Sequence, residues 1–306
     1  MFRLDDFILL LVIFLSLLAG ILLPRPASVF QPYPIYLMMF LLFLSFLSIK
    51  VEAIWSTVKN NLKTVVWLSF LKLILLPVSI FFLFRAFFPS YAIAALLLTG
   101  ISTGVVAPFI STLVNANVNL VLVMVVISSP LVPFTLPALV KILLGRSIEI
   151  SLVSMMRILC MVVFVPLLTV EILRRLAPGM LNTIMKRRYP ISLVIFAVIN
   201  LGVFSKYSQF FHQNPLTILQ ATFVAFLLGG IYVVVGICAL WKGPSENQIS
   251  SAISLGNMNN VLVLVFASEF FTPLEPTVAA MYMIPFFGLI FPLRLYQRLR
   301  QKQSKS

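Results

Sequence analysis

The chain has 306 residues, of which 61% are hydrophobic and 10% are charged, and its mean hydropathy is +1.11. This composition excludes a soluble globular protein, because too few polar residues are present to cover a water-facing surface. The net charge of +14 does not indicate nucleic-acid binding, since the Lys and Arg residues cluster at the ends of apolar runs. Cys160 and Cys238 lie inside apolar runs and support neither a disulfide framework nor a metal site.

Long apolar runs dominate the sequence, and a transmembrane helix needs about 20 apolar residues. We predict ten spans, over residues 7–23, 33–49, 64–86, 90–114, 118–144, 150–173, 189–205, 215–241, 249–271 and 274–293. The first run lacks a small-residue cleavage pattern, so we expect it to be retained as a span. The predicted fold class is an all-α polytopic protein with ten transmembrane helices in a lipid bilayer.

Residues 50–63, between the second and third predicted spans, are too polar to cross a membrane. Within them Val51, Ile54, Trp55 and Val58 recur at helical spacing. This pattern predicts an amphipathic helix that lies in the membrane interface.

The Lys and Arg residues indicate the orientation of the chain. Most of them lie at the N-terminus, in every second loop and at the C-terminus, and the longest basic loop is 174–188. Cytoplasmic loops carry an excess of such residues. We therefore expect a protein of the cell (inner) membrane with both termini in the cytoplasm.

Two landmarks repeat at one offset along the chain. Gly100 and Gly256 lie 156 positions apart (256 minus 100), and the tripeptide Tyr-Pro-Ile opens the second span at Tyr33 and the seventh at Tyr189, at the same offset. Five spans per half is an odd number, so the second half must run with opposite topology, as in inverted-repeat transporters. The predicted repeats are residues 1–148, with spans 1 to 5, and residues 149–306, with spans 6 to 10.

Both the fourth and the ninth predicted spans contain a polar interruption. In the fourth, Gly100-Ile-Ser102-Thr103-Gly104 is followed by Pro108, and in the ninth Ser254-Leu-Gly256 is followed by three asparagines. Glycine and proline at this density break a membrane helix, so the freed backbone groups must face a cavity or other protein.

Two broken helices that meet near the midplane can form a binding site. Half-helix N-termini offer N–H donors and partial positive charge to an anionic group. The predicted substrate-binding residues are Ser102, Thr103, Gly104, Gly256, Asn257, Asn259 and Asn260. The alternative is that the small residues permit close helix packing and the asparagines bridge helices.

Three further polar features lie inside predicted spans. Lys72 lies about 12 Å from the start of the third span by helical rise, where an ionised group costs about 2.5 to 3.5 kcal/mol and usually serves a site; the alternative is that it snorkels to the interface. Arg157, early in the sixth span, could snorkel or pair with a helix end. In the fifth span, Ser128 and Ser129 precede three prolines and either line the cavity or bond carbonyls that the prolines leave free.

Catalytic motifs are missing from the sequence. It contains no nucleotide fingerprint, no Ser/His/Asp set and no metal-ligand spacing, and its sole histidine, His212, falls in a polar loop. An enzyme is therefore not supported, and we expect no cofactor and no obligate protein partner.

The arrangement resembles the bile acid sodium symporter superfamily. The most specific stretch runs from Asn115-Ala-Asn117-Val-Asn119 to Ser129, Pro133 and Pro137, and Gly256-x-x-Asn259 also matches. The resemblance implies a panel domain (spans 1, 2, 6 and 7) and a core domain (spans 3 to 5 and 8 to 10) in which spans 4 and 9 cross.

The sodium ligands of that superfamily do not carry over to this sequence. The positions that the resemblance assigns to them hold Ala107, Pro108, Val121 and Val125, while the crossover glutamate falls at Ser254 and a glutamine of the third span at Lys72. Hard cations need several oxygen ligands, usually with an anionic one, and none of the eight Asp and Glu residues lies near either interruption. Bound sodium is therefore not favoured.

We therefore predict a secondary active transporter that carries a small organic anion by alternating access. It would be independent of sodium or coupled to protons, with the charge of Lys72 in place of a sodium ion. The alternatives are a sodium-coupled symporter of organic anions or bile acids, an auxin- or arsenite-type efflux carrier, and a membrane sensor or channel-like protein that does not cycle. Substrate identity and direction stay open.

Overall fold

The computed structural model describes residues 4–47, 57–59, 61–145 and 151–303. This part of the chain is helical, and its only extended pairing is an isolated bridge between Thr103 and Met258. The all-α class is therefore as predicted. The predicted amphipathic helix over residues 50–63 lies largely outside the described residues.

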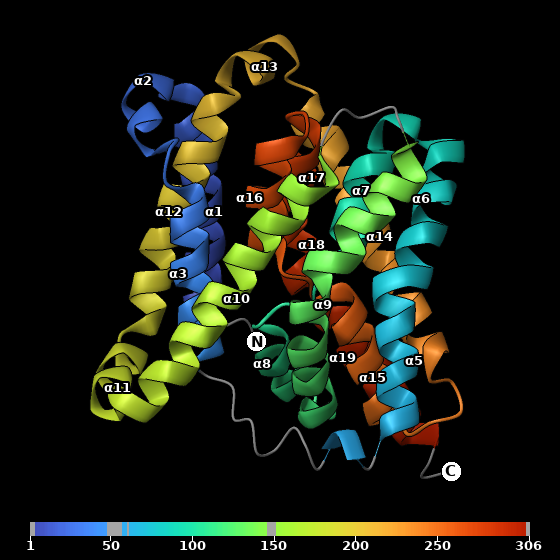
Figure 1. Cartoon of the computed structure of the whole chain (residues 1–306). Helices are drawn as coiled ribbons and strands as arrows, with labels where there is room; N and C mark the ends of the chain where they lie inside the picture. Colours follow the sequence, from blue (N-terminus) through green and yellow to red (C-terminus); the bar gives the residue numbers. More distant parts are fainter. Residues whose placement is uncertain (1–3, 48–56, 60, 146–150, 304–306) are drawn as a thin grey trace.

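The first half of the chain forms helices separated by short turns (Figure 1). They are α1 (Leu4–Leu22), α2 (Pro24–Ala27), η1 (Ser28–Phe30), α3 (Pro34–Phe46), α5 (Leu62–Phe70), the π-helical segment η2 (Leu71–Leu75), α6 (Leu76–Phe87), η3 (Pro89–Tyr91), α7 (Ala92–Gly100), α8 (Ala107–Leu113) and α9 (Val118–Leu144).

The second half has the same character. Its helices are α10 (Leu152–Leu176), α11 (Pro178–Lys186), α12 (Arg188–Lys206), α13 (Ser208–Gln213), α14 (Thr217–Ala239), α15 (Ser245–Gly256), α16 (Asn260–Phe270), α17 (Leu274–Met281), α18 (Met283–Gly288) and α19 (Ile290–Gln303).

Six helical stretches in the described residues are long and apolar enough to cross a membrane. They are Leu62–Phe87, Val118–Leu144, Leu152–Leu176, Arg188–Lys206, Thr217–Ala239 and Leu274–Arg300. A seventh results if Leu11–Leu22 and Pro24–Phe30, which meet at 109°, form one span. The shorter apolar helices Pro34–Phe46, Pro89–Gly100 and Asn260–Phe270 fall on three other predicted spans. The chain is thus a multi-pass membrane protein, and the count of ten stays a prediction.

The helices form two groups that lie side by side (Figure 1). α1 packs against α12, and α3 packs against α10 and α12; we call these four helices, with the α1–α3 and α10–α12 connections, the panel group and the others the core group, while the panel and core domains themselves stay a prediction. In the core group, α6 packs against α7, α14 against α15, and α17 against α7, α14 and α16. The two groups meet where α10 contacts α9 and where α16 contacts α3 and α12.

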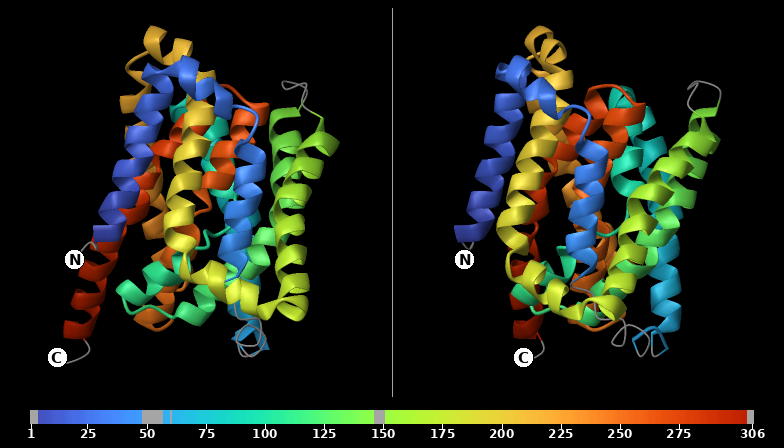
Figure 2. Two further views of the ribbon diagram at one scale, coloured as in Figure 1. Left: turned by 90° about the vertical axis from the view of Figure 1, so that its left-hand side faces the viewer. Right: turned by 60° about the vertical axis from the view of Figure 1, so that its left-hand side comes forward.

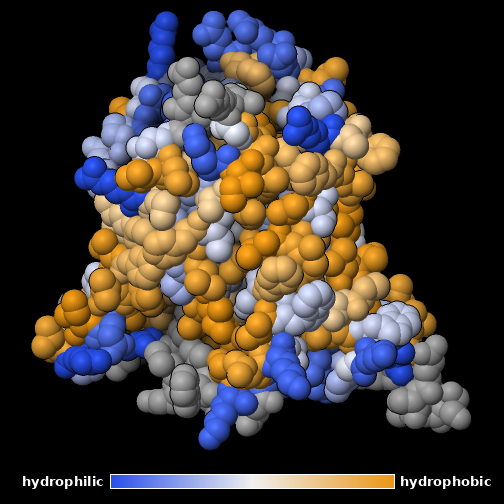
Figure 3. Space-filling model, turned by 45° about the vertical axis from the view of Figure 1, so that its right-hand side comes forward, coloured by the Kyte–Doolittle hydropathy of each residue, from blue (hydrophilic) through white to orange (hydrophobic). Residues whose placement is uncertain are grey.

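The ends of the molecule differ from its middle. Figure 3 shows a broad hydrophobic band between more hydrophilic ends, as expected for a surface that faces lipid. The start of α1 and the end of α19 lie in the lower half of both views in Figure 2. α11 and the start of α5 lie at that same end in Figure 1, whereas α2 and α13 lie at the opposite end.

Candidate functional site

The two polar interruptions meet in the core group. α7 ends at Gly100 and α15 ends at Gly256, as the sequence predicts. Beyond these ends the main chains run antiparallel: the N–H of Gly104 donates to the carbonyl of Asn257 at 2.7 Å, and the N–H of Asn259 donates to the carbonyl of Ser102 at 3.0 Å. We call this contact the crossing.

Glycine makes the crossing sterically feasible. A Cβ atom added to Gly104 would lie 2.6 Å from the carbonyl oxygen of Met258, which is backbone and cannot easily move. Pro108 lies in the first turn of α8, where its missing N–H leaves no bond unmade. Asn259 caps α16, because its side-chain oxygen accepts from the N–H of Leu262 at 3.4 Å.

Thr103 fixes the crossing to two other helices. Its N–H donates to the hydroxyl oxygen of Ser128 at 3.0 Å, and its own hydroxyl donates to the carbonyl of Ser254 at 2.8 Å. Ser128 thus belongs to the crossing. Ser129 does not, because its hydroxyl donates to the carbonyl of Val125 within α9.

The serines of α9 do not replace the bonds that its prolines remove. Pro130 and Pro133 leave the carbonyls of Val126 and Ser129 without their usual helical donors. The hydroxyl groups of Ser128 and Ser129 donate instead to Met124 and Val125. The alternative role predicted for these hydroxyls is therefore wrong.

These bonds correct one expectation from the sequence. The N–H groups of Thr103, Gly104 and Asn259 were expected to face an anion, but they donate to protein oxygens. The physical reason is that a backbone donor in a dry interior needs a partner in every state of the protein. In this conformation these backbone groups hold the crossing together, and the substrate-binding role of the residues stays a prediction.

The last turn of α15 receives side-chain donors from three different elements. Helix C-termini leave carbonyls without intrahelical partners and carry partial negative charge. The carbonyls of Ser254, Leu255 and Gly256 accept from the Thr103 hydroxyl at 2.8 Å, the Lys72 ammonium at 3.3 Å and the Tyr282 hydroxyl at 2.7 Å, respectively. We call this turn the α15 end.

Lys72 is completely buried, with 0% of its surface exposed. It lies in the π-helical segment η2, and π-turns inside α-helices are frequent at functional sites. Its ammonium points inward to Leu255, so the alternative of snorkelling to the interface is wrong. No carboxylate of a described residue lies within salt-bridge distance of it. Its ammonium donates to the carbonyl of Leu255 at a helix C-terminus, where partial negative charge favours a cation.

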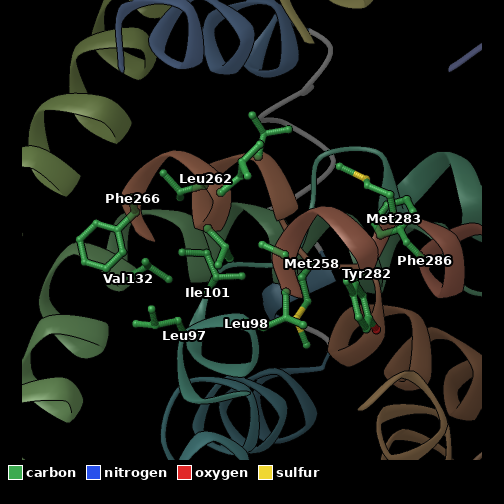
Figure 4. Close-up of a cluster of buried hydrophobic side chains, with 14 of the residues drawn as sticks. Leu97, Leu98, Ile101, Val132, Met258, Leu262, Phe266, Tyr282, Met283 and Phe286 are labelled. Atoms are coloured by element: carbon green, nitrogen blue, oxygen red, sulfur yellow. The ribbon is translucent and has the colours of Figure 1, made fainter. Parts of the chain in front are cut away.

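Two buried tyrosines, which the sequence analysis missed, complete this region. The hydroxyl groups of Tyr232 and Thr99 lie 2.7 Å apart, and the rings of Tyr232 and Tyr282 meet edge to face with centroids 5.9 Å apart. Figure 4 shows Tyr282 next to Met258, which lies beside Leu98. A tyrosine in the middle of an apolar span is itself a signal, because its hydroxyl needs a buried partner.

Four buried side-chain polar atoms of the described residues have no hydrogen-bond partner in the protein: Ser102 Oγ, Ser251 Oγ, Asn257 Oδ1 and Asn260 Oδ1. The amide nitrogens of the two asparagines donate to the Phe286 carbonyl at 2.9 Å and the Met283 sulfur at 3.4 Å, which fixes the orientation of both amides. An unpaired buried polar atom costs about 1 to 3 kcal/mol. Ser102, Asn257 and Asn260 are therefore the best candidates for ligand contact.

The remaining predicted residues lie elsewhere. Arg157 is exposed on α10, and His212 is exposed on α13, where its Nδ1 lies 2.8 Å from the carbonyl of Ser208. Neither reaches the crossing. Within the described residues, no group of three or more His, Cys, Asp or Glu side chains is placed to hold a metal ion.

The crossing is closed to the outside in this conformation. All seven predicted substrate-binding residues are buried, and the most exposed of them, Asn259, exposes only 9% of its surface. A substrate can reach these residues only after helices move apart.

Apolar spans that are interrupted at a buried polar crossing define a multi-pass membrane protein with the architecture of secondary transporters. A model of the Sodium Bile acid symporter family matches residues 35–214, which is more than half of the chain. The chain belongs to this family, and it is a membrane transporter of the organic-anion or bile-acid type. No curated protein gave a significant match.

Proposed function

We propose that the protein is a secondary active carrier of a small organic anion that works by alternating access without a bound sodium ion. The observation that carries this proposal is the contact between Lys72 and the carbonyl of Leu255. It places a fixed positive charge at a half-helix end, where secondary transporters use backbone carbonyls to coordinate their coupling ion.

The α15 end supports sodium independence. Its three consecutive carbonyls already accept hydrogen bonds from Lys72, Thr103 and Tyr282. A sodium ion at this place would have to displace these donors and would also meet the ammonium at close range. Release of the Lys72 proton would remove that charge, which gives a route to proton coupling.

The inverted repeat is supported by contacts that occur in exchanged pairs. α1 of the first half packs against α12 of the second, and α10 of the second packs against α3 of the first. Likewise α7 packs against α17, and α15 packs against α9. Each contact thus has a counterpart in which the halves exchange roles, as two repeats over residues 1–148 and 149–306 would produce.

The orientation that we propose for the chain in the membrane follows from the distribution of its Lys and Arg residues. The basic residues on one side include Arg174, Arg175 and Arg187 of the α10–α11–α12 region, Lys63 at the start of α5, and Lys242 in the turn between α14 and α15. The positive-inside rule assigns this side to the cytoplasm of the cell (inner) membrane, together with both termini.

The substrate site that we propose is the crossing together with Lys72. The free hydroxyl of Ser102 can donate to the carboxylate, the free Oδ1 atoms of Asn257 and Asn260 accept from hydroxyl or amino groups of the substrate, and Lys72 supplies positive charge. Gly104, Asn259 and Thr103 hold the two broken helices in register.

Uptake into proteoliposomes tests the proposal. The purified protein is reconstituted, and uptake of radiolabelled small carboxylates is measured with a sodium gradient, with a proton gradient and with neither. We expect saturable uptake and counterflow that do not change when sodium is replaced by choline. Strict sodium dependence would overturn the proposed coupling, and uptake that does not saturate would indicate a channel.

A further inference from the structure

A pair of hydrogen bonds joins the panel group to the core group far from the crossing. The ammonium of Lys206 and the hydroxyl of Tyr207 both donate to the carbonyl oxygen of Ser268, at 3.0 and 2.9 Å. Lys206 ends α12 and Tyr207 follows it, whereas Ser268 lies in the last turn of α16. Since α12 leads directly into α13, this contact lies toward the end of the molecule that carries α2 and α13 (Figure 1).

The position of Ser268 in the last turn of α16 explains why its carbonyl accepts both hydrogen bonds. Carbonyls in the last turn of a helix have no intrahelical donor, and a cation is favourable there because of the helix dipole. Burial, with Glu269 and Glu275 adding to the effect, raises the pKa of Tyr207 to about 12. Its hydroxyl therefore stays protonated and able to donate at every physiological pH.

The donors move with the panel group, because the end of α12 is tied to other panel elements. The Gln31 side chain donates to the Ser205 hydroxyl at 3.2 Å, and the Ser208 hydroxyl donates to the carbonyl of Ile21 at 2.5 Å. The backbone at Gly202 also approaches the Phe30 carbonyl so closely that an added Cβ atom would lie 2.6 Å from its oxygen.

The acceptor is connected to the crossing through α16, because this helix starts at Asn260, directly after the crossing residue Asn259, and contains Ser268. This helix has 11 residues and a length of about 16 Å by helical rise. Asn259 and Asn260 lie at its start, and Ser268 lies near its end. The helix packs most extensively against α17 of the core group, so we expect it to move with the core.

We propose that Lys206, Tyr207 and Ser268 form a gate latch, which closes the pathway to the crossing on the side of α13 and opens in each transport cycle. The inference rests on the alternating access of the proposed function, in which the core moves against the panel. It identifies the present conformation as closed on that side, and α16 as the element that connects the latch to the crossing.

Cysteine labelling tests the latch without knowledge of the substrate. In a background with Cys160→Ala and Cys238→Ala, Ser268→Cys is introduced, and its reaction with a membrane-impermeant maleimide is followed from the α13 side. Adding Tyr207→Phe removes one bond of the latch, and we expect labelling to become about fivefold faster, as the loss of one net hydrogen bond predicts. The control Tyr91→Phe removes the hydrogen bond from the Tyr91 hydroxyl to Gln220, which is not part of the latch, and should leave the rate unchanged.

Reversible cross-linking tests the movement itself. Tyr207→Cys and Ser268→Cys are joined by a short reducible bifunctional reagent, and the control pair Gln31→Cys and Ser205→Cys is joined in the same way. We expect the first cross-link to abolish uptake until reductant is added, and the control to have no effect.

Two results would overturn the latch: full transport with residues 207 and 268 joined, or a labelling rate that Tyr207→Phe leaves unchanged. If no anion is transported even by the wild type, the proposed function fails, and the labelling rates still decide the latch.

Discussion

The ends of α7 and α15, which the proposed inverted repeat relates to each other, meet different chemistry. At α15, three carbonyls accept side-chain donors, and one donor is the ammonium of Lys72. At α7, Thr99 meets the neutral hydroxyl of Tyr232. The proposed repeat thus carries charge at one of its two helix ends alone, and we interpret that asymmetry as the basis of coupling in the proposed carrier.

Removal of the positive charge of Lys72 should have the largest effect on uptake. We expect Lys72→Ala to lower uptake by tenfold or more, because a hydrogen bond from a charged group contributes about 1.5 to 3 kcal/mol. Folding should persist, since the substitution also removes the cost of a buried charge. Uptake and melting temperature are measured together, with the exposed Lys141→Ala as the matched control. Uptake at the wild-type level in Lys72→Ala would contradict a role for the ammonium.

Replacement of the Lys72 ammonium by a site for a sodium ion should have the next largest effect on uptake. The double variant Lys72→Gln with Ser254→Glu restores the residue types that the family resemblance implies at these positions. It frees the carbonyl of Leu255 and adds a carboxylate, which together suit a hard cation. We expect uptake to become stimulated by sodium by about tenfold, a difference of about 1.4 kcal/mol. Measurements over a sodium titration check this, with Ser254→Glu alone as the control, which should pair with Lys72 and stay insensitive to sodium.

The close approach at the crossing predicts a graded series of glycine substitutions. Gly104→Ala places a Cβ atom 2.6 Å from a backbone oxygen, whereas Gly100→Ala places one 2.9 Å from the flexible side chain of Leu136. We expect Gly104→Ala to lower the free energy of unfolding by about 1 to 3 kcal/mol, and Gly100→Ala to lower it by less. Gly230→Ala, which meets nothing within 4 Å, should be neutral or stabilising. Thermal unfolding in detergent ranks the three variants, and equal losses would contradict the steric argument.

Much of this fold follows from the sequence. Runs of apolar residues place the helices, and the predicted span 118–144 coincides with α9. Both helix breaks could be predicted from glycines, at Gly100 and Gly256, because glycine destabilises a helix locally, whatever surrounds it. Family membership was also predicted correctly.

The bonds at the site could not be derived in the same way. A break in a helix shows which backbone groups lose their partners, but the new partners come from distant segments, such as Ser128 for Thr103 and Tyr282 for Gly256. For this reason the amides expected to bind an anion proved to hold the crossing together. The inward direction of Lys72 also depends on α15, which lies far from it in the sequence.

The two tyrosines give the smallest effect and the most direct test of the asymmetry between the helix ends. Tyr282→Phe leaves the carbonyl of Gly256 without its side-chain donor, beside the carbonyl that binds Lys72. Tyr232→Phe removes a contact of Thr99, whose hydroxyl still bonds Ala95 within α7. We expect both to lower the free energy of unfolding by about 0.5 to 1.5 kcal/mol.

Uptake should separate these two variants. It should fall severalfold in Tyr282→Phe, because the freed carbonyl competes for the Lys72 ammonium, and it should change little in Tyr232→Phe. The ratio of uptake to stability loss in the two variants is the quantity to compare. Equal ratios would mean that the α7 and α15 ends serve packing alike, and that the charge at α15 does not couple to transport.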